Sequence, residues 1–136
     1  MKVPFLDISS INKEFEKELQ KDFNRVFRSG NLILSSEVRK FEESFAQYSG
    51  VKYCVGVANG LQGLEMVLRS WDIKQGDEVI VPSNTFIATW LAISSVGAIP
   101  VPVEPDLESY NINPSLIEEK ITSKTKAIIV VHLYGL

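Results

Sequence analysis

The sequence has few of the side chains that form covalent or metal cross-links, with one cysteine and one histidine among 136 residues. A single cysteine cannot form an internal disulfide, so we expect a reducing, cytoplasmic setting. We also expect no bound metal. Positive charge is not in excess either, because 14 basic residues stand against 17 acidic ones and the net charge is −3. Without a basic stripe, neither nucleic acids nor anionic membranes are expected as partners.

Charge is also missing from the whole of residues 79–103, a stretch long enough to span a bilayer. Pro82, Gly97, Pro100 and Pro102 interrupt it, however, together with several serines. Such breaks favour a buried strand–helix–strand unit, and we therefore predict no membrane helix here.

The first fifty residues are predicted to form a helical segment, residues 1–50. Apolar residues recur at helical spacing over residues 11–28, and Gly30 closes this helix. A second helix is expected over residues 36–49, capped by Ser35 or Ser36. The uncharged residues 31–34 form the loop between them.

From residue 51 the pattern changes to short apolar runs that alternate with helical periodicity. Strands that are apolar throughout and separated by helices are typical of parallel sheets covered on both faces. The sequence therefore predicts an α/β fold, with a mainly parallel sheet flanked by helices. The predicted strands are residues 53–58, 78–81, 99–103 and 127–131, and the predicted helices are residues 60–72, 85–96 and 114–121.

Ligands of such sheets bind where the strands end, so we expect a site at this edge. After the first predicted strand, Gly60 leads directly into a helix, which leaves several backbone N–H groups directed at one point and suits a phosphate. Gly60 and Gly63 would equally allow tight packing of strand against helix. After the second strand, Phe86 is either a ring that stacks on a flat heteroaromatic cofactor or a core residue of helix 85–96.

Other polar residues at the same edge have more ordinary interpretations. Residues 83–85 are ligand contacts or helix caps, and capping is the commoner role. His132 is a general base or a structural hydrogen-bonding group. Glu104 and Asp106 flank a proline in what we interpret as a turn.

Short motifs are spread over essentially all 136 residues. They are Val3-Pro4-Phe5-Leu6-Asp7, Val57-Ala58-Asn59-Gly60, residues 76–82, Thr85-Phe86-Ile87-Ala88-Thr89, Glu104-Pro105-Asp106, Tyr110-Asn111-Ile112 and residues 125–135. In combination they resemble the amino-terminal part of the DegT/DnrJ/EryC1/StrS family of pyridoxal-phosphate-dependent sugar aminotransferases. The resemblance implies the first part of a fold type I (aspartate aminotransferase-like) large domain, residues 51–136.

The resemblance also implies roles for particular residues. The cofactor phosphate would lie on Gly60, Leu61 and Gln62, the ring of Phe86 would stack on the pyridine, and Asn31 and Leu32 would lie near the substrate. Leu61 stands where a hydroxyl residue is common in the family, so it offers the phosphate only its backbone N–H. Asn31-Leu32 stands where bulky aromatics are common.

The implied activity is transfer of an amino group from a donor such as glutamate to a nucleotide-linked keto-deoxysugar, by a homodimer that uses pyridoxal 5'-phosphate. The family's Schiff-base lysine and the carboxylate beside the pyridine nitrogen would fall beyond Leu136, so the 136 residues alone are expected to be inactive. A deoxysugar dehydratase of the same family, with a histidine in place of that lysine, is an alternative. A non-catalytic nucleotide-binding or regulatory module is another.

Overall fold

The computed structural model of the chain describes residues 3–135. These residues form two compact units, one that ends at Gly56 and one that begins at Val57. Residues 3–135 contain no helix with the length and apolarity that a membrane crossing requires.

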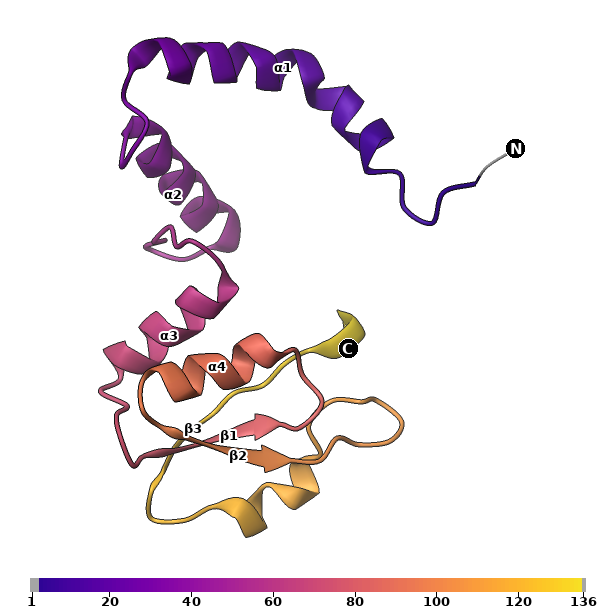
Figure 1. Cartoon of the computed structure of the whole chain (residues 1–136), viewed down its shortest axis with the longest axis vertical. Coiled ribbons are helices and arrows are strands. Elements are labelled where there is room, and N and C mark those ends of the chain that lie inside the picture. Colours follow the sequence, from indigo (N-terminus) through magenta and orange to yellow (C-terminus); the bar gives the residue numbers. More distant parts are fainter. Residues whose placement is uncertain (1–2, 136) are drawn as a thin grey trace. The chain divides into compact units, whose positions relative to one another are not determined.

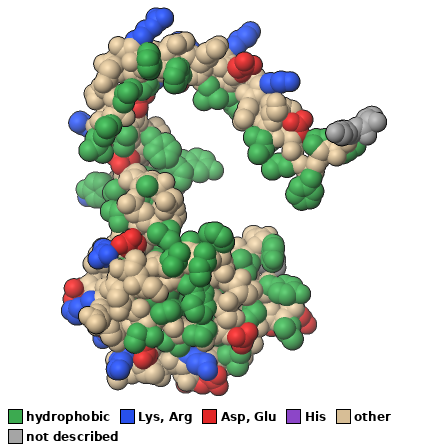
Figure 2. All heavy atoms as spheres, in the orientation of Figure 1, with side chains coloured by type: hydrophobic (Ala, Val, Ile, Leu, Met, Phe, Trp, Pro, Cys, Tyr) green, Lys and Arg blue, Asp and Glu red, His purple; other side chains and the backbone are tan. Residues whose placement is uncertain are grey.

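The first unit contains two helices, α1 (Ile8–Ser29) and α2 (Ser36–Ser49) (Figure 1). Each begins at a side-chain cap and ends at a glycine in the left-handed conformation, which confirms the two predicted helices apart from three extra residues at the start of α1. No residue of α1 is buried, and its apolar side chains are visible along the helix in Figure 2. Six of the large apolar residues of α1 are more than half exposed: Ile8, Ile11, Phe15, Leu19, Phe23 and Phe27.

The second unit is an α/β structure, as predicted. Its three strands pair only in parallel, in the order β2-β1-β3, and α4 lies along one face of this sheet (Figure 1). Its helices and strands are α3 (Gly60–Ser70), β1 (Glu78–Pro82), α4 (Ile87–Ser95), β2 (Ile99–Val103) and β3 (Thr125–Ile128).

The central strand β1 supplies both faces of the core. Val79 and Val81 point to one face, where they pack with Leu68 of α3 and Ile93 of α4. Ile80 points to the other face. Successive side chains of a strand alternate between faces, so a strand buried on both sides must be apolar throughout. The second cluster consists of Ile80, Val103 and Ile112, with Val101, Leu116 and Ile117 packed against it.

Two of the predicted elements are wrong. Residues 53–58 form no strand, because a strand exists only in a ladder and none of residues 3–135 pairs with this segment. Cys54, the single cysteine, lies in this segment and is partly buried. The predicted helix 114–121 is instead two short 3₁₀ turns, Pro114–Leu116 and Glu118–Lys120.

The second error concerns the hydrogen-bond pattern of this segment, which still packs on the core. Leu116 and Ile117 are neighbours in sequence, and both pack against the cluster around Ile80. Here the backbone hydrogen bonds span three residues, from the Ile117 N–H to the Pro114 carbonyl at 3.3 Å and from the Lys120 N–H to the Ile117 carbonyl at 2.9 Å, which is the 3₁₀ pattern. The last strand is also displaced, since β3 spans Thr125–Ile128 where residues 127–131 were predicted.

Candidate functional site

The glycine turn before α3 is a capped helix start. Asn59 is the N-cap, with an extended backbone (φ −165°, ψ 175°), and its side-chain Oδ1 accepts from the backbone N–H of Gln62 at 3.0 Å. The Asn59 carbonyl accepts from the N–H of Gly63 at 3.1 Å. The side-chain Oε1 of Gln62 turns back and accepts from the N–H of Ala58 at 2.7 Å. The backbone N–H and the side-chain Oε1 of Gln62 are therefore both engaged within the chain.

The amides of Gly60 and Leu61 differ from that of Gln62. Within residues 3–135 neither donates a hydrogen bond, as expected for the first two positions of a helix. They lie at the positive end of the α3 dipole. A Cβ built on Gly60 meets nothing within 4 Å, so the approach to these two amides is open. The helix start thus offers two free donors to an anion.

Phe86 lies at the corresponding end of α4. It is the N-cap residue of that helix, and its side chain is 79% exposed. Its interpretation as a core residue of helix 85–96 is therefore wrong. Its exposed ring has a free face, which a core phenylalanine lacks.

One cavity brings these groups together. It has a volume of about 800 Å³, and its lining includes Gly60, Leu61 and Phe86. Gln62 is not part of the lining, nor is any lysine. The wall is mostly apolar, and its polar groups belong to Asn59, Thr89 and the backbone at the start of α3. The complete lining is Asn59, Gly60, Leu61, Leu64, Phe86, Ile87, Ala88, Thr89 and Leu91.

The other polar residues of the strand ends hold loops in place. The Asn84 side chain donates from Nδ2 to the carbonyl of Tyr110 at 3.0 Å, and Asn111 Oδ1 accepts from the N–H of Leu133 at 2.9 Å. These two bonds join the segments that follow β1, β2 and β3. Sequence reasoning missed Asn111 in this role, because nothing in its spacing indicates which segment it contacts.

Asp106 belongs to a turn, as its sequence context indicated. Its Oδ1 accepts from the N–H groups of Ser109 at 2.9 Å and Glu108 at 3.0 Å. These hydrogen bonds, that of Ser109 first, hold the pKa of the Asp106 carboxyl below its usual value. A carboxylate kept ionised by its own turn is poorly suited to proton transfer near neutral pH. Residues 3–135 also bring no three His, Cys, Asp or Glu side chains together as a metal site requires.

Asn31 and Leu32, the predicted substrate contacts, lie in the turn between α1 and α2. The Asn31 N–H donates to Ser29 Oγ at 3.2 Å, and the side chain of Leu32 is 62% exposed. A hollow of about 120 Å³ lies at this turn. It is lined by Arg25, Val26, Ser29, Asn31, Ser35, Ser36 and Glu37.

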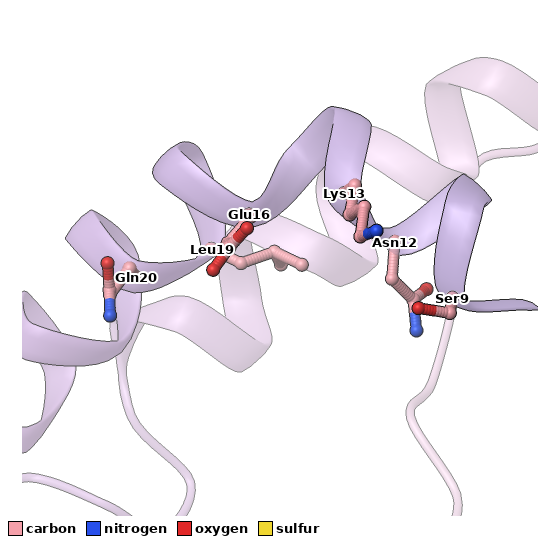
Figure 3. A pocket seen from close by; sticks show the side chains of 6 residues that line it. All are labelled: Ser9, Asn12, Lys13, Glu16, Leu19 and Gln20. Atoms are coloured by element: carbon pink, nitrogen blue, oxygen red, sulfur yellow. The ribbon is translucent and has the colours of Figure 1, made fainter.

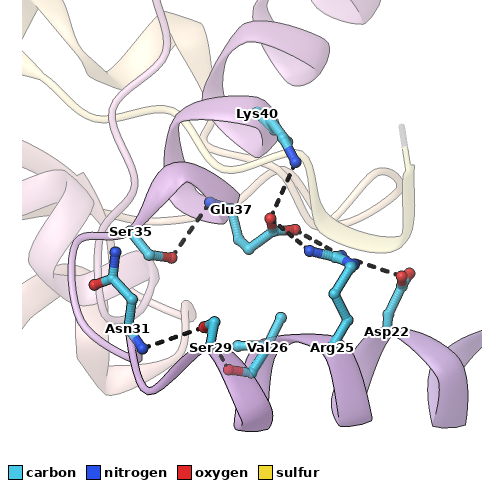
Figure 4. Close-up of polar contacts among 8 residues, drawn as sticks. All are labelled: Asp22, Arg25, Val26, Ser29, Asn31, Ser35, Glu37 and Lys40. Carbon is cyan, nitrogen blue, oxygen red and sulfur yellow. Dashed lines mark hydrogen bonds and ion pairs between the residues drawn. The ribbon is translucent and has the colours of Figure 1, made fainter.

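An ion pair spans the same turn (Figure 4). Arg25 donates from Nη1 to Glu37 Oε1 at 2.7 Å and from Nη2 to Glu37 Oε2 at 2.9 Å. The hydrogen bonds from Arg25, followed by that from Lys40, lower the pKa of Glu37 to about 2. Because this pKa is depressed, any stability from the pair is present above the ordinary value of 4.5 and is lost as the pH falls through about 2.

This pKa is directly measurable. We expect the carboxyl carbon of Glu37 to titrate by NMR with a midpoint near 2, and with a midpoint well above 2 in Arg25→Ala, because the strongest hydrogen bonds to the carboxylate are then gone. Lys40→Ala is the control and should move the midpoint less. Equal shifts in the two variants would contradict the leading role of Arg25.

A second hollow, of about 690 Å³, follows α1 (Figure 3). All of its lining residues come from this one helix, so it is an open surface groove without groups that converge from different elements. They are Ser9, Asn12, Lys13, Glu16, Leu19 and Gln20.

Solved structures similar to this chain are aminotransferases. Among solved structures, the chain is similar to DesV from S. venezuelae in complex with a ketimine intermediate, with a TM-score of 0.93 and 46% identity over 98% of this chain and 36% of that one. It is also similar to NtdA from Bacillus subtilis with bound cofactor PMP, with a TM-score of 0.89 and 34% identity over 98% of this chain and 31% of that one.

The sequence comparisons narrow this class. Residues 13–136 match the sequence model of the DegT/DnrJ/EryC1/StrS aminotransferase family, and the chain belongs to this family. It is 62% identical to a dTDP-3-amino-3,6-dideoxy-alpha-D-galactopyranose transaminase from Aneurinibacillus thermoaerophilus, over 98% of this chain and 37% of that protein. The chain thus spans little more than a third of the length of this relative.

Proposed function

We propose that the complete protein transfers an amino group between an amino acid such as glutamate and a nucleotide-linked keto-deoxysugar, with pyridoxal phosphate as cofactor. The observation that carries this proposal is the cavity at the starts of α3 and α4, where two free backbone amides and an exposed aromatic ring line one apolar space. Family membership and the named transaminase at 62% identity support the same activity. Pyridoxal phosphate supplies an electron sink and carries the amino group between the two substrates.

The residues of the cavity fit this cofactor. The N–H groups of Gly60 and Leu61 would hold its phosphate at the positive end of α3, and Gln62 would join them if its amide exchanged Asn59 for the phosphate. Phe86 would orient the ring by stacking on it. The mostly apolar wall would keep water away from the reacting atoms. We assign residues 51–136 to the first part of the cofactor-binding domain and residues 1–50 to a helical segment.

No lysine lines this cavity, so in the proposed enzyme the lysine that holds the cofactor and moves the proton comes from another part of the protein. Asn31 and Leu32 are proposed to contact the sugar. That the complete protein is a cytoplasmic homodimer stays a prediction.

The activity is tested with the complete gene product, pyridoxal phosphate, dTDP-3-amino-3,6-dideoxy-alpha-D-galactopyranose and 2-oxoglutarate. The amino group should pass to 2-oxoglutarate, so that glutamate and the keto sugar form in equal amounts. Loss of water from the sugar without glutamate formation would instead identify a dehydratase. Absence of any reaction with this or other amino sugars would favour a regulatory protein.

Phe86 allows a specific prediction about the cofactor. Phe86→Leu keeps an apolar side chain but removes the ring face, and we expect it to weaken the binding of pyridoxamine phosphate about threefold to tenfold. Phe86→Tyr keeps the ring and should bind like the wild type. Because the side chain is 79% exposed, neither change should alter the thermal midpoint of the apo protein. Equal affinity in the leucine variant would contradict stacking by this ring.

A further inference from the structure

An ion pair between Arg25 and Glu37 joins the two ends of the turn between α1 and α2. The two residues are 12 positions apart, Arg25 on the last turns of α1 and Glu37 on the first turn of α2. The two terminal guanidinium nitrogens, Nη1 and Nη2, each donate to one of the two carboxylate oxygens, and this bidentate arrangement fixes the angle between the two planar groups as well as their distance (Figure 4). The pair therefore closes residues 26–36 into a ring.

The neighbouring charges support this pair from within each helix. Asp22 Oδ1 accepts from Arg25 Nη2 at 3.1 Å, three residues back on α1. Lys40 donates from Nζ to Glu37 Oε1 at 3.1 Å, three residues ahead on α2. Each of these bonds stays within one helix. Within this cluster, the bonds between Arg25 and Glu37 alone join the two helices across the turn.

Within the turn, one non-glycine residue has an unusual backbone conformation. Leu34 has a φ of 48°, in the left-handed region that a branched side chain rarely adopts. Such a conformation persists where the surroundings over-determine it. Ser35, which is buried, caps α2 on one side, and Gly30 ends α1 on the other. Between these fixed ends, Leu32, Ile33 and Leu34 point their apolar side chains into solvent, each more than 60% exposed.

Three exposed apolar side chains on a turn fixed at both ends have the form of a preorganised contact surface. We infer that Arg25 and Glu37 are positioning residues: they hold the turn that carries Asn31 and Leu32 in its binding conformation before the sugar arrives. This inference rests on the proposed function, in which that turn contacts the nucleotide-linked sugar. The pair acts through the backbone and does not itself touch the substrate. Because the pair has already ordered the turn, the conformational entropy of ordering it is not lost when the sugar binds.

The test compares two amines that react with the same cofactor form of the complete gene product. Glutamate and dTDP-3-amino-3,6-dideoxy-alpha-D-galactopyranose each convert bound pyridoxal phosphate to its amine form, with the same absorbance change. In Arg25→Ala and in Glu37→Ala we expect half-saturation to need about fivefold more amino sugar, while the glutamate reaction stays at the wild-type rate. The double variant should be no worse than either single one, because the two residues act as one pair.

Lys40→Ala is the matched control, since it removes a charge from the same cluster without opening the turn, and it should react like the wild type. Arg25→Lys keeps the charge but loses the bidentate contact, and its half-saturation by the amino sugar should lie between those of the wild type and Arg25→Ala. Hydrogen exchange adds a readout independent of activity: the hydrogen-bonded amides at the two ends of the turn, those of Gly30, Asn31 and Val38, should exchange faster in Arg25→Ala and Glu37→Ala but not in Lys40→Ala.

Two results would overturn the inference. One is faster exchange of the turn with unchanged half-saturation by the amino sugar, which would separate the turn from the sugar site. The other is an equal loss with glutamate and with the sugar, which would indicate a general structural defect. A wild-type enzyme that reacts with neither amine would refute the proposed function itself, and the exchange rates would then still decide whether the pair holds the turn.

Discussion

Gly60→Pro is expected to weaken the binding of pyridoxamine phosphate about tenfold to a hundredfold, because it deletes one N–H group that donates to the phosphate. The substitution removes this donor with little other change. Proline is accepted at the first position of a helix, and Asn59 before it already has the extended backbone that a proline requires. The amide of Gly60 makes no hydrogen bond in residues 3–135 that the change would break. The helix should therefore form as before.

Gly60→Ala is the matched control. It adds a methyl group where nothing lies within 4 Å and keeps the N–H, so its dissociation constant should stay close to that of the wild type. Pyridoxamine phosphate is the appropriate probe because it forms no Schiff base with a lysine, and its affinity reports the noncovalent contacts alone. The complete gene product should be used, with circular dichroism to check the helix content of each variant.

Two outcomes would contradict this assignment. If alanine weakens binding as much as proline does, the position is sensitive to bulk, and its amide is not the phosphate donor. If neither substitution has an effect, the phosphate lies elsewhere. The result also bears on Leu61, which offers the phosphate only its backbone N–H. Without a hydroxyl group at that position, the site depends more strongly on its backbone amides.

The features that sequence reasoning predicted correctly depend on neighbours within a few residues. The start of α3 follows from an asparagine and a glycine at a strand-like end, and the end of α1 follows from Gly30. Gly60, Leu61 and Phe86 each lie beside such a start and line one cavity, while their contacts with a cofactor stay a prediction. The engagement of Gln62 by Asn59 was also accessible, from the spacing of a cap residue and a glutamine three positions later.

What sequence reasoning missed depends on contacts between distant segments. Residues 53–58 have the composition of a strand, but a strand also needs a neighbour, and composition cannot supply one. The Arg25–Glu37 pair was missed for the same reason, because its geometry requires two helices to meet at a particular angle across a turn. The sequence around Arg25 predicts only a charged helix face, and several other arginines and lysines have the same local context.

The largest effect on stability is expected from Ile93→Ala on α4. Ile93 is fully buried and packs with Val79 and Val81 of β1, so its truncation leaves a cavity and should lower the free energy of unfolding by about 2–5 kcal/mol. Ile87→Ala makes the same change on the same helix at a side chain that is 56% exposed. It should cost about 1 kcal/mol or less, as is usual for exposed positions. Urea unfolding of the apo protein measures both values.

The Ile93→Ala variant also connects the core to the proposed site. No side chain caps α4 at Phe86, so the position of this helix depends mainly on its apolar contacts with the sheet, Ile93 foremost among them. Loss of the Ile93 side chain should therefore also weaken the binding of pyridoxamine phosphate, although this residue does not line the cavity. An equal loss of stability in the two variants would contradict the assignment of Ile93 to the core. Unchanged cofactor affinity in a destabilised Ile93→Ala would show that Phe86 is held by something other than the packing of α4.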